Sequence, residues 1–280
     1  MMDIRFNILN EKVSKFIVVE SKFSHSGREK KLNFDINNYK KFKDKIIYLV
    51  IEKEPENILK IDDSGDSLGI QRLNSLKRIE QSYDFMQNGL NEANENDLIL
   101  LSDNDEIPNL DSDKFVKSNK DIFIFRQLFF YYKFNLLYNS MFWHGTKACK
   151  KKKLVSMSWL RNLKNKKYPF WRFDTLFSKN KYTNLEIIEN GGWHFTNLKS
   201  PEDLFEKMKN FGHHNEFDKS GIGIEDIRKK IEKHELFYDH FLDQSDPKKW
   251  NSNYKLKKTE LNILPKYIQE NESNLRDWFA

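Results

Sequence analysis

Apolar residues gather into short unbroken runs through the first half of the chain. Four runs have the length of a strand and do not alternate with polar residues: 16–19, 46–51, 98–101 and 122–125. Such runs are typical of strands buried on both faces, as in a parallel sheet covered by helices. Between the second and third runs, apolar residues recur every three or four positions, which predicts a helix with one buried stripe formed by Leu73, Leu76, Ile79, Tyr83, Met86 and Leu90. This order of strand, helix and strand predicts an α/β fold with a mostly parallel central sheet flanked by helices.

The second half of the chain has the pattern of helices. Ser200 fits a helix cap, with Pro201 at the first helical position and acidic residues in the first turn. Leu204, Met208 and Phe211 then form a buried stripe, and a second helix is indicated by Ile224, Ile227 and Ile231. We therefore expect a single domain over 1–280, with a sheet-containing core over about 1–198 and a helical C-terminal section over about 199–280.

Composition narrows the class of protein. The chain has 48 Lys and Arg residues against 42 Asp and Glu residues, a net charge of +6 that suits acidic partners without naming one. A single cysteine, Cys149, excludes an intramolecular disulfide and a cysteine-based zinc site. No stretch approaches the roughly 20 apolar residues of a membrane span, and residues 1–10 lack the core of a signal peptide. We expect a cytoplasmic protein with at most peripheral membrane contact and no nucleic-acid partner.

The sharpest chemical signal is the acidic cluster Asp103-Asn104-Asp105-Glu106, which directly follows the third apolar run. Ligands of open α/β sheets bind at the carboxyl ends of strands, and Glu20 follows the first run in the same way. Hard divalent cations prefer oxygen ligands and bridge to substrate phosphates. The cluster therefore predicts a site for Mn²⁺ or Mg²⁺, although a turn or helix cap ahead of Pro108 would use the same residue types.

Histidines and an arginine provide further candidates. His194 lies in Gly191-Gly192-Trp193-His194-Phe195 and is a third metal ligand, a hydrogen-bond donor to a phosphate or a packed core side chain. His213, His214 and Glu216 offer a proton acceptor or donor contacts, but adjacent histidines face different directions, so at most one enters a site. Arg161 suits bidentate phosphate binding.

Aromatic residues and lysines each form a dense segment. The aromatic segment 127–138 is interpreted as a core strand or hairpin rather than a sugar-stacking platform. The lysine run 150–153 is either a solvated loop or a cationic flap near a diphosphate. We find no glycine-rich dinucleotide fingerprint, no P-loop and no serine nucleophile elbow in the sequence.

Taken together, the motifs resemble glycosyltransferase family 17, whose best-known member is a β-1,4-mannosyl-glycoprotein β-1,4-N-acetylglucosaminyltransferase. The resemblance is strongest at 101–108 and runs in order through 18–21, 24–27, 45–47, 89–90, Trp143-x-Gly145, 192–195, Phe211-x-His213 and 264–271. It implies a GT-A type fold, an inverting reaction, a bound Mn²⁺ or Mg²⁺, a nucleotide-sugar donor (UDP-N-acetylglucosamine) and a glycan acceptor hydroxyl.

The resemblance also implies roles for individual residues. Asp105 would bind the metal, Asp103 would contact the donor's ribose or join Asp105 at the metal, and His194 would lie in the site as a further metal ligand. As a separate mechanistic hypothesis, we take Glu216 or Glu20 as the catalytic base. The residues expected at the donor are Glu20, Ser26, Gly27, Lys30, Asp103, Asp105, Arg161, Trp193, His194, His213 and His214.

The sequence departs from the family pattern at two places. Ser82-Tyr83 stands where the family has a Gln-Arg pair. The pattern Phe-x-His selects His213, whereas His-x-Glu selects His214 and Glu216, so either histidine is the one equivalent to the family's.

Two other classes of function are compatible with the basic charge and the acidic cluster. One is a non-catalytic basic module for RNA or anionic polysaccharide, and the other is a metal-dependent phosphohydrolase or nucleotidyltransferase.

Overall fold

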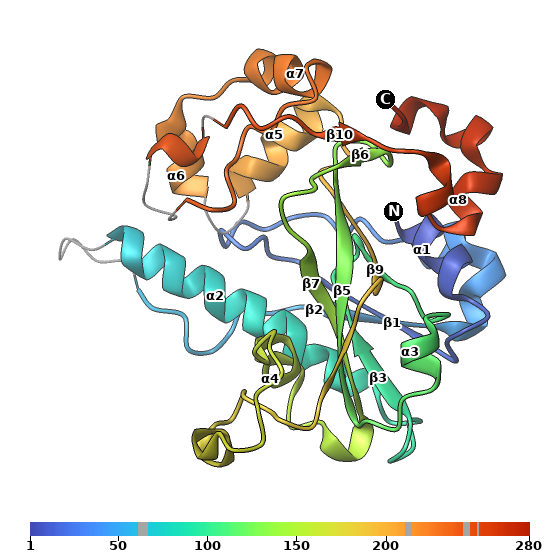
Figure 1. Ribbon diagram of the computed structural model, residues 1–280. Helices are drawn as coiled ribbons and strands as arrows, with labels where there is room; N and C mark the ends of the chain where they lie inside the picture. The colour runs from blue at the N-terminus through green and yellow to red at the C-terminus, as the bar shows by residue number, and fades with distance from the viewer. Residues whose placement is uncertain (61–66, 211–213, 243–246, 251) are drawn as a thin grey trace. The chain divides into compact units, whose positions relative to one another are not determined.

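The computed structural model describes residues 1–60, 67–210, 214–242, 247–250 and 252–280 (Figure 1). The chain divides into two compact units. Unit 1 comprises residues 1–16, 86–196 and 258–280, and unit 2 comprises residues 17–85 and 197–257. None of the helices in this described part of the chain combines the length and the apolar character needed to cross a bilayer.

The sheet of unit 1 is built around β5 (Ile122–Tyr131), which runs through its centre in Figure 1. β5 is antiparallel to β7 (Trp143–Lys150) and parallel to β9 (Gly192–Thr196). β7 pairs in turn with β3 (Leu98–Leu101), again antiparallel. The shorter strands are β4 (Glu106–Pro108), antiparallel to β9, β6 (Leu136–Leu137), antiparallel to β5, β8 (Glu186–Ile188), parallel to β5, and β10 (Lys257–Lys258).

All four predicted strands exist, but the prediction of a mostly parallel sheet is wrong, because the sheet is mixed. β3 and β5 run in the same direction, as two neighbours in a parallel sheet would, yet β7 lies between them and is antiparallel to both. Only a short connection, 132–135, separates β5 from β6, and a short connection of this kind returns the chain antiparallel, so that β6 and then β7 both run antiparallel to β5. A run buried on both faces does not reveal the direction of its neighbour.

The core of unit 1 is aromatic. Phe123, Phe125, Phe129 and Phe130 of β5 are all buried, as are the aromatic side chains that follow it. This confirms the interpretation of 127–138 as a core segment. Burial raises the pKa of the Cys149 thiol on β7 to about 12, so this thiol stays protonated and unreactive.

Helices from both ends of the chain complete unit 1. α1 (Met2–Leu9) packs against α8 (Lys266–Glu270). α4 (Met157–Asn162) packs against β7 and begins at Ser156, whose hydroxyl accepts a hydrogen bond from the Trp159 backbone N–H at 3.0 Å. The remaining short helices are α3 (Asp113–Val116), η2 (Met86–Gly89), η3 (Lys151–Lys153), η4 (Phe173–Phe177), η6 (Leu261–Ile263) and η7 (Glu272–Trp278).

Unit 2 contains a two-stranded sheet of β1 (Phe16–Ser21) and β2 (Ile46–Ile51), with η1 (Ile36–Lys45) before β2 and α2 (Ser67–Phe85) packed on it. The predicted helix is confirmed as far as Phe85, but the prediction that it continues through Met86 to Leu90 is wrong, because η2 follows at Met86. The predicted buried stripe is also wrong at Leu73 and Leu76, which are 50% and 53% exposed. Asn74 is buried instead, because its amide exchanges hydrogen bonds of 2.9 and 2.8 Å with the backbone of Leu59. The inner face of α2 is polar at this turn because it holds a neighbouring loop.

The other part of unit 2 is helical, as predicted, with α5 (Pro201–Asn210), α6 (His214–Ser220), α7 (Ile224–Glu232) and η5 (Pro247–Trp250). The Ser200 hydroxyl accepts the Asp203 backbone N–H at 3.0 Å, which confirms the predicted start of α5. Leu204 and Met208 are buried where α5 packs against α6 and α7. Phe211, predicted on the same stripe, lies outside the described residues.

Candidate functional site

The acidic cluster forms a tight turn between β3 and β4 in unit 1. The Glu106 backbone N–H donates to the Asp103 carbonyl at 3.1 Å, and the Asp103 backbone N–H donates to the Glu106 carboxylate at 3.0 Å. β9 then fixes the turn from the other side, because the Phe195 N–H donates to the Asp105 carbonyl at 2.8 Å. The turn conformation therefore depends on both the backbone and the side chain of Glu106.

Glu106 is completely buried beneath this turn. Its Oε1 accepts hydrogen bonds from Trp143 Nε1 at 2.7 Å and from Arg161 Nη1 at 3.3 Å. Burial and the nearby Asp103 carboxylate raise the pKa of Glu106, while Arg161, His194 and Trp143 act in the opposite direction. Gly145 lies against this side chain, since a Cβ there would stand 2.4 Å from the Glu106 carboxyl carbon. The Trp143-x-Gly145 motif thus gives one residue that binds Glu106 and one that makes room for it.

Two arginines balance the charge of the turn. Arg161, on α4, places Nη2 2.9 Å from Asp103 Oδ2 and also donates to the Gly145 carbonyl at 3.3 Å. Arg5, on α1, donates to the Glu106 carbonyl oxygen. Burial lowers the pKa of Arg5, and the three carboxylates of the cluster raise it. The sequence identified Arg161 but not Arg5, which is 101 residues from its partner and carries no motif.

His194 is packed beside the second aspartate of the turn. Its Nε2 lies 3.5 Å from Asp105 Oδ2, and its ring stacks between Phe129 and Trp143, with centroid distances of 4.7 and 4.6 Å. The His194 side chain is 7% exposed, against 20% for Asp105 and 39% for Asp103. The cluster is therefore closed on the histidine side and accessible at its two aspartates. Within the described part of the chain, the buried Nδ1 of His194 has no hydrogen-bond partner.

Asp105 and His194 bring an oxygen and a nitrogen donor together, whereas Asp103 is paired with Arg161. Across the described residues, no three His, Cys, Asp or Glu side chains form a group arranged to hold a metal ion. Mg²⁺ is commonly held by one or two carboxylates together with substrate phosphates and water, so it needs no complete cage of protein ligands. Asp105 and His194 would fit a cation of this kind only as a partial set of ligands, which phosphates and water would have to complete.

In unit 2, Glu20 at the end of β1 is surrounded by donors. Its carboxylate accepts hydrogen bonds from Lys30 Nζ at 2.7 Å, the Asn33 N–H at 2.8 Å, the Phe34 N–H at 3.0 Å and the Tyr48 hydroxyl at 3.2 Å. Burial alone raises the pKa of Glu20, but these hydrogen bonds and the Lys30 charge outweigh it and hold the pKa below its usual value. Glu20 thereby fastens the loop 30–34 to the two-stranded sheet.

The neighbouring loop 24–27 is held by α2. Gly27 has a φ of 89°, and a Cβ there would lie 2.4 Å from Arg78 Nη2. Arg78 donates to the His25 carbonyl at 3.1 Å and pairs with Glu54 at 2.8 Å, while the Ser26 hydroxyl hydrogen-bonds that of Ser24 at 2.9 Å. The sequence did not single out Arg78, which stands one turn before the departure noted at Ser82-Tyr83.

The remaining candidates lie elsewhere. Trp193 points to the opposite face of β9 from His194 and donates to the Ile263 carbonyl at 2.6 Å, because successive residues of a strand alternate faces. His213 lies outside the described residues. His214 is the first residue of α6, and the structure describes its backbone but not its side chain. Glu216 is half-buried in the first turn of α6.

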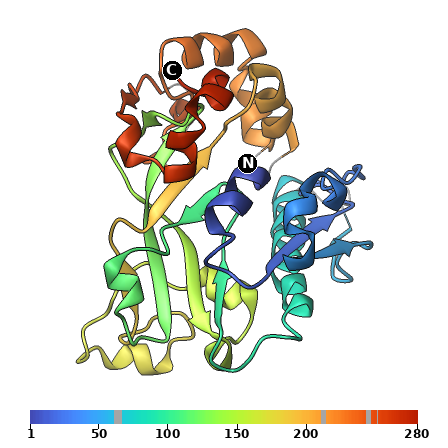
Figure 2. The ribbon, with the colours of Figure 1, turned by 90° about the vertical axis from the view of Figure 1, so that its right-hand side faces the viewer.

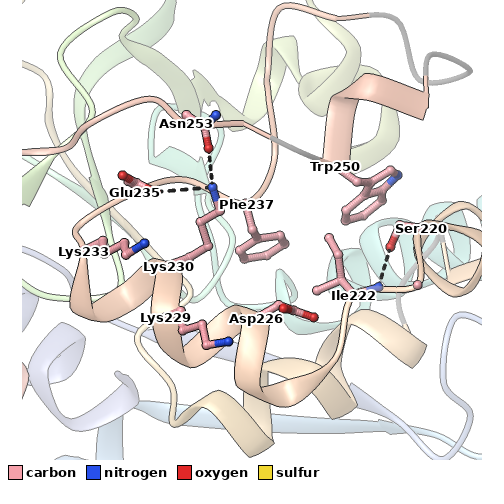
Figure 3. Close-up of a pocket in the computed structure, with 11 residues that line it drawn as sticks. Ser220, Ile222, Asp226, Lys229, Lys230, Lys233, Glu235, Phe237, Trp250 and Asn253 are labelled. Atoms are coloured by element: carbon pink, nitrogen blue, oxygen red, sulfur yellow. Dashed lines mark hydrogen bonds and ion pairs between the residues drawn. The ribbon is translucent and has the colours of Figure 1, made fainter.

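Unit 2 also contains a pocket of about 540 Å³ beside α7 (Figure 3). Phe237 and Trp250 form its apolar side, and lysines of α7 stand around it. Lys230 is fixed by Asn253 at 2.7 Å and Glu235 at 3.3 Å. None of the site residues predicted from the sequence lines this pocket.

Comparison with known proteins identifies the chain. A model described as glycosyltransferase family 17 matches residues 1–276, which is nearly the whole chain and includes every residue of the site described above. The protein is therefore an enzyme of the glycosyltransferase class. It belongs to glycosyltransferase family 17, which confirms the resemblance found in the sequence. No curated protein and no solved structure matches it.

The bonding of Glu20 predicts a pH-dependent stability. Glu20→Gln should lower the free energy of unfolding at pH 7 by about 1–3 kcal/mol, because an amide cannot accept all of the hydrogen bonds that the carboxylate accepts. A carboxyl whose pKa is depressed by folding stabilises above its unfolded pKa of about 4.3, and this contribution is lost as pH falls through the folded pKa. The difference between variant and wild type should therefore shrink from pH 7 to pH 3 in urea unfolding. The exposed Glu56→Gln is the control, with an expected change below about 0.5 kcal/mol; an equal Glu20→Gln effect at both pH values would contradict the account.

Proposed function

We propose that the turn Asp103–Glu106 binds the diphosphate of a nucleotide-sugar donor, UDP-N-acetylglucosamine, together with Mn²⁺ or Mg²⁺. The observation that carries this proposal is the pairing of two accessible aspartates with a completely buried Glu106 that fixes their turn. Exposed surface turns do not need such an anchor, whereas a binding site gains from donors held in place before the ligand arrives. A GT-A type arrangement of the donor site, as the family implies, is part of the proposal.

The charges around the turn suit a departing nucleoside diphosphate. The metal ion would be held by Asp105, with His194 beside it, and it supplies positive charge that stabilises the leaving diphosphate. Arg161 presents a planar guanidinium already oriented by Asp103 and Glu106, so it can bind phosphate oxygens without reorganisation. Stacking between Phe129 and Trp143 holds the His194 ring and thereby the position of Asp105.

We assign the catalytic base to Glu216 rather than Glu20. In an inverting transfer, the acceptor hydroxyl attacks the anomeric carbon as the bond to the diphosphate breaks, and a base takes the hydroxyl proton. Glu20 accepts several hydrogen bonds in the protein and its pKa is lowered, so it is a poor proton acceptor. Glu216 lies in the first turn of α6, two residues after His214. Glu20, with Lys30, Ser26 and Gly27, is assigned to shaping the donor-binding loops.

Calorimetric titration of UDP tests the donor site. Wild type should bind UDP in the presence of Mn²⁺ and lose affinity when the metal is chelated. Asp105→Ala should weaken the Mn²⁺-dependent binding by about 10–100-fold or more, the effect typical of damaging a metal site. The matched control is Asp113→Ala on α3, where the carboxylate is 88% exposed and pairs with Lys117 four residues along the chain. Wild-type affinity in Asp105→Ala, or equal UDP binding with and without metal, would refute the assignment.

Turnover tests the base. Glu216→Gln should keep the Mn²⁺-dependent affinity for UDP but lower kcat by about 10²–10⁴-fold, the usual contribution of general base catalysis. The readout is UDP release from UDP-N-acetylglucosamine in the presence of a β-mannosyl oligosaccharide acceptor. Glu232→Gln, an exposed residue of α7, is the control and should retain wild-type kcat. Unchanged kcat in Glu216→Gln would remove Glu216 from the mechanism.

A further inference from the structure

Unit 1 carries a segment whose large apolar side chains are turned to solvent. We name residues 168–177 the aromatic loop. Its exposed members are Phe170 (85%), Trp171 (62%), Phe173 (73%), Leu176 (76%) and Phe177 (90%). Single exposed apolar residues are common on proteins, but contiguous apolar patches mark sites of interaction. The core of the same unit buries its aromatic residues almost completely, whereas this short segment exposes five large apolar side chains close together in the sequence.

The aromatic loop is presented by a fixed base. Its two flanks are joined where the Lys164 N–H donates to the Asn180 carbonyl at 2.9 Å and the Tyr168 N–H donates to the Tyr182 carbonyl at 3.4 Å. Trp159 of α4 donates through Nε1 to the Lys179 carbonyl at 2.7 Å, and its ring packs edge-on against Tyr182. Figures 1 and 2 show the loop, in yellow, at the extremity of unit 1 beside α4. These contacts fix the two flanks of the aromatic loop and leave its apolar tip exposed to solvent.

The charge around the loop is strongly positive. Residues 164–182 contain six cationic side chains (Lys164, Lys166, Lys167, Arg172, Lys179 and Lys181) against one carboxylate, a net charge of +5. The one carboxylate, Asp174, is paired with Arg172 at 2.7 Å and Lys181 at 3.0 Å, and these contacts lower its pKa. The five lysines stand in the flanks, whereas Arg172 lies in the loop itself, where it pairs with Asp174.

We propose that the aromatic loop docks the enzyme on an anionic lipid membrane surface. Aromatic and leucine side chains would enter the boundary between headgroups and acyl chains, while the lysines in the flanks face the anionic headgroups. Charge complementarity decides between occupants. A second copy of this chain would bring a second loop of charge +5 against the first, whereas an anionic bilayer offers the opposite charge and an apolar layer beneath it. This role is independent of the donor site proposed above.

Vesicle flotation tests the docking. Wild type should float with vesicles of phosphatidylglycerol and phosphatidylcholine, bind phosphatidylcholine vesicles more weakly, and dissociate as salt is raised. The combined variant Phe170→Ser, Trp171→Ser and Phe177→Ser should reduce the partition coefficient by about tenfold or more, because it removes most of the inserting apolar area. Lys166→Gln with Lys167→Gln should reduce binding to anionic vesicles by a similar factor. The control is Val116→Ser with Phe241→Ser, which removes two side chains of 68% and 67% exposure elsewhere and should leave partition unchanged.

Fluorescence then locates the loop in the bilayer. Lipids brominated on their acyl chains should quench part of the tryptophan emission of wild type, and Trp171→Phe should lose that quenching while still floating with the vesicles. Absence of vesicle binding, or equal binding by the triple serine variant, would overturn the proposal. Sedimentation velocity distinguishes the membrane from a second copy of the chain as the partner of the loop. If wild type self-associates without lipid and the triple serine variant does not, a second copy binds the loop and the membrane assignment fails.

Discussion

The burial of the Glu106 carboxylate is the constraint from which the site of this enzyme follows. A carboxylate removed from water must be met by hydrogen-bond donors, since an uncompensated buried charge is strongly destabilising. Donors come from β7 through Trp143, from α4 through Arg161 and from the turn itself through the Asp103 N–H, while Arg5 of α1 binds the Glu106 backbone. One side chain thus ties together elements from three distant parts of the sequence. The same contacts orient the two aspartates that face solvent.

The residues of this acidic cluster have two different roles, one structural and one in binding the substrate. Glu106 is too deep and too fully bonded to meet a substrate, and it instead sets the geometry of Asp103 and Asp105. In unit 2, Glu20 acts in the same manner on the loop 30–34, and Arg78 acts so on the loop 24–27. The lysine run 150–153, by contrast, behaves as an ordinary surface segment, with Lys150 paired to Asp121 at 2.6 Å and Lys152 bonded to Asn96 at 2.8 Å.

Local features of the fold were predictable from the sequence, and its long-range pairings were not. The four apolar runs became strands and Ser200 caps its helix, because both signals depend on neighbouring residues alone. The insertion of β7 between β3 and β5 was missed, since a fully buried strand looks the same in either pairing direction. At the site, Asp105, Asp103, Arg161 and His194 were anticipated and do lie in one cluster. Arg5 and Arg78 were not, because a cation held by partners that are distant in the sequence carries no pattern of its own. Leu73 and Leu76 were wrongly placed inside because the inner face of α2 binds loops through polar groups.

Anomalous diffraction at the manganese edge, from crystals of the full chain grown with UDP and Mn²⁺, tests the central claim most directly. The account predicts a manganese peak within coordination distance of the Asp105 carboxylate, with the UDP diphosphate on the other side of the ion and Glu106 still buried beneath the turn. A manganese and UDP site away from the turn Asp103–Glu106, with Asp105 in contact with neither, would contradict it.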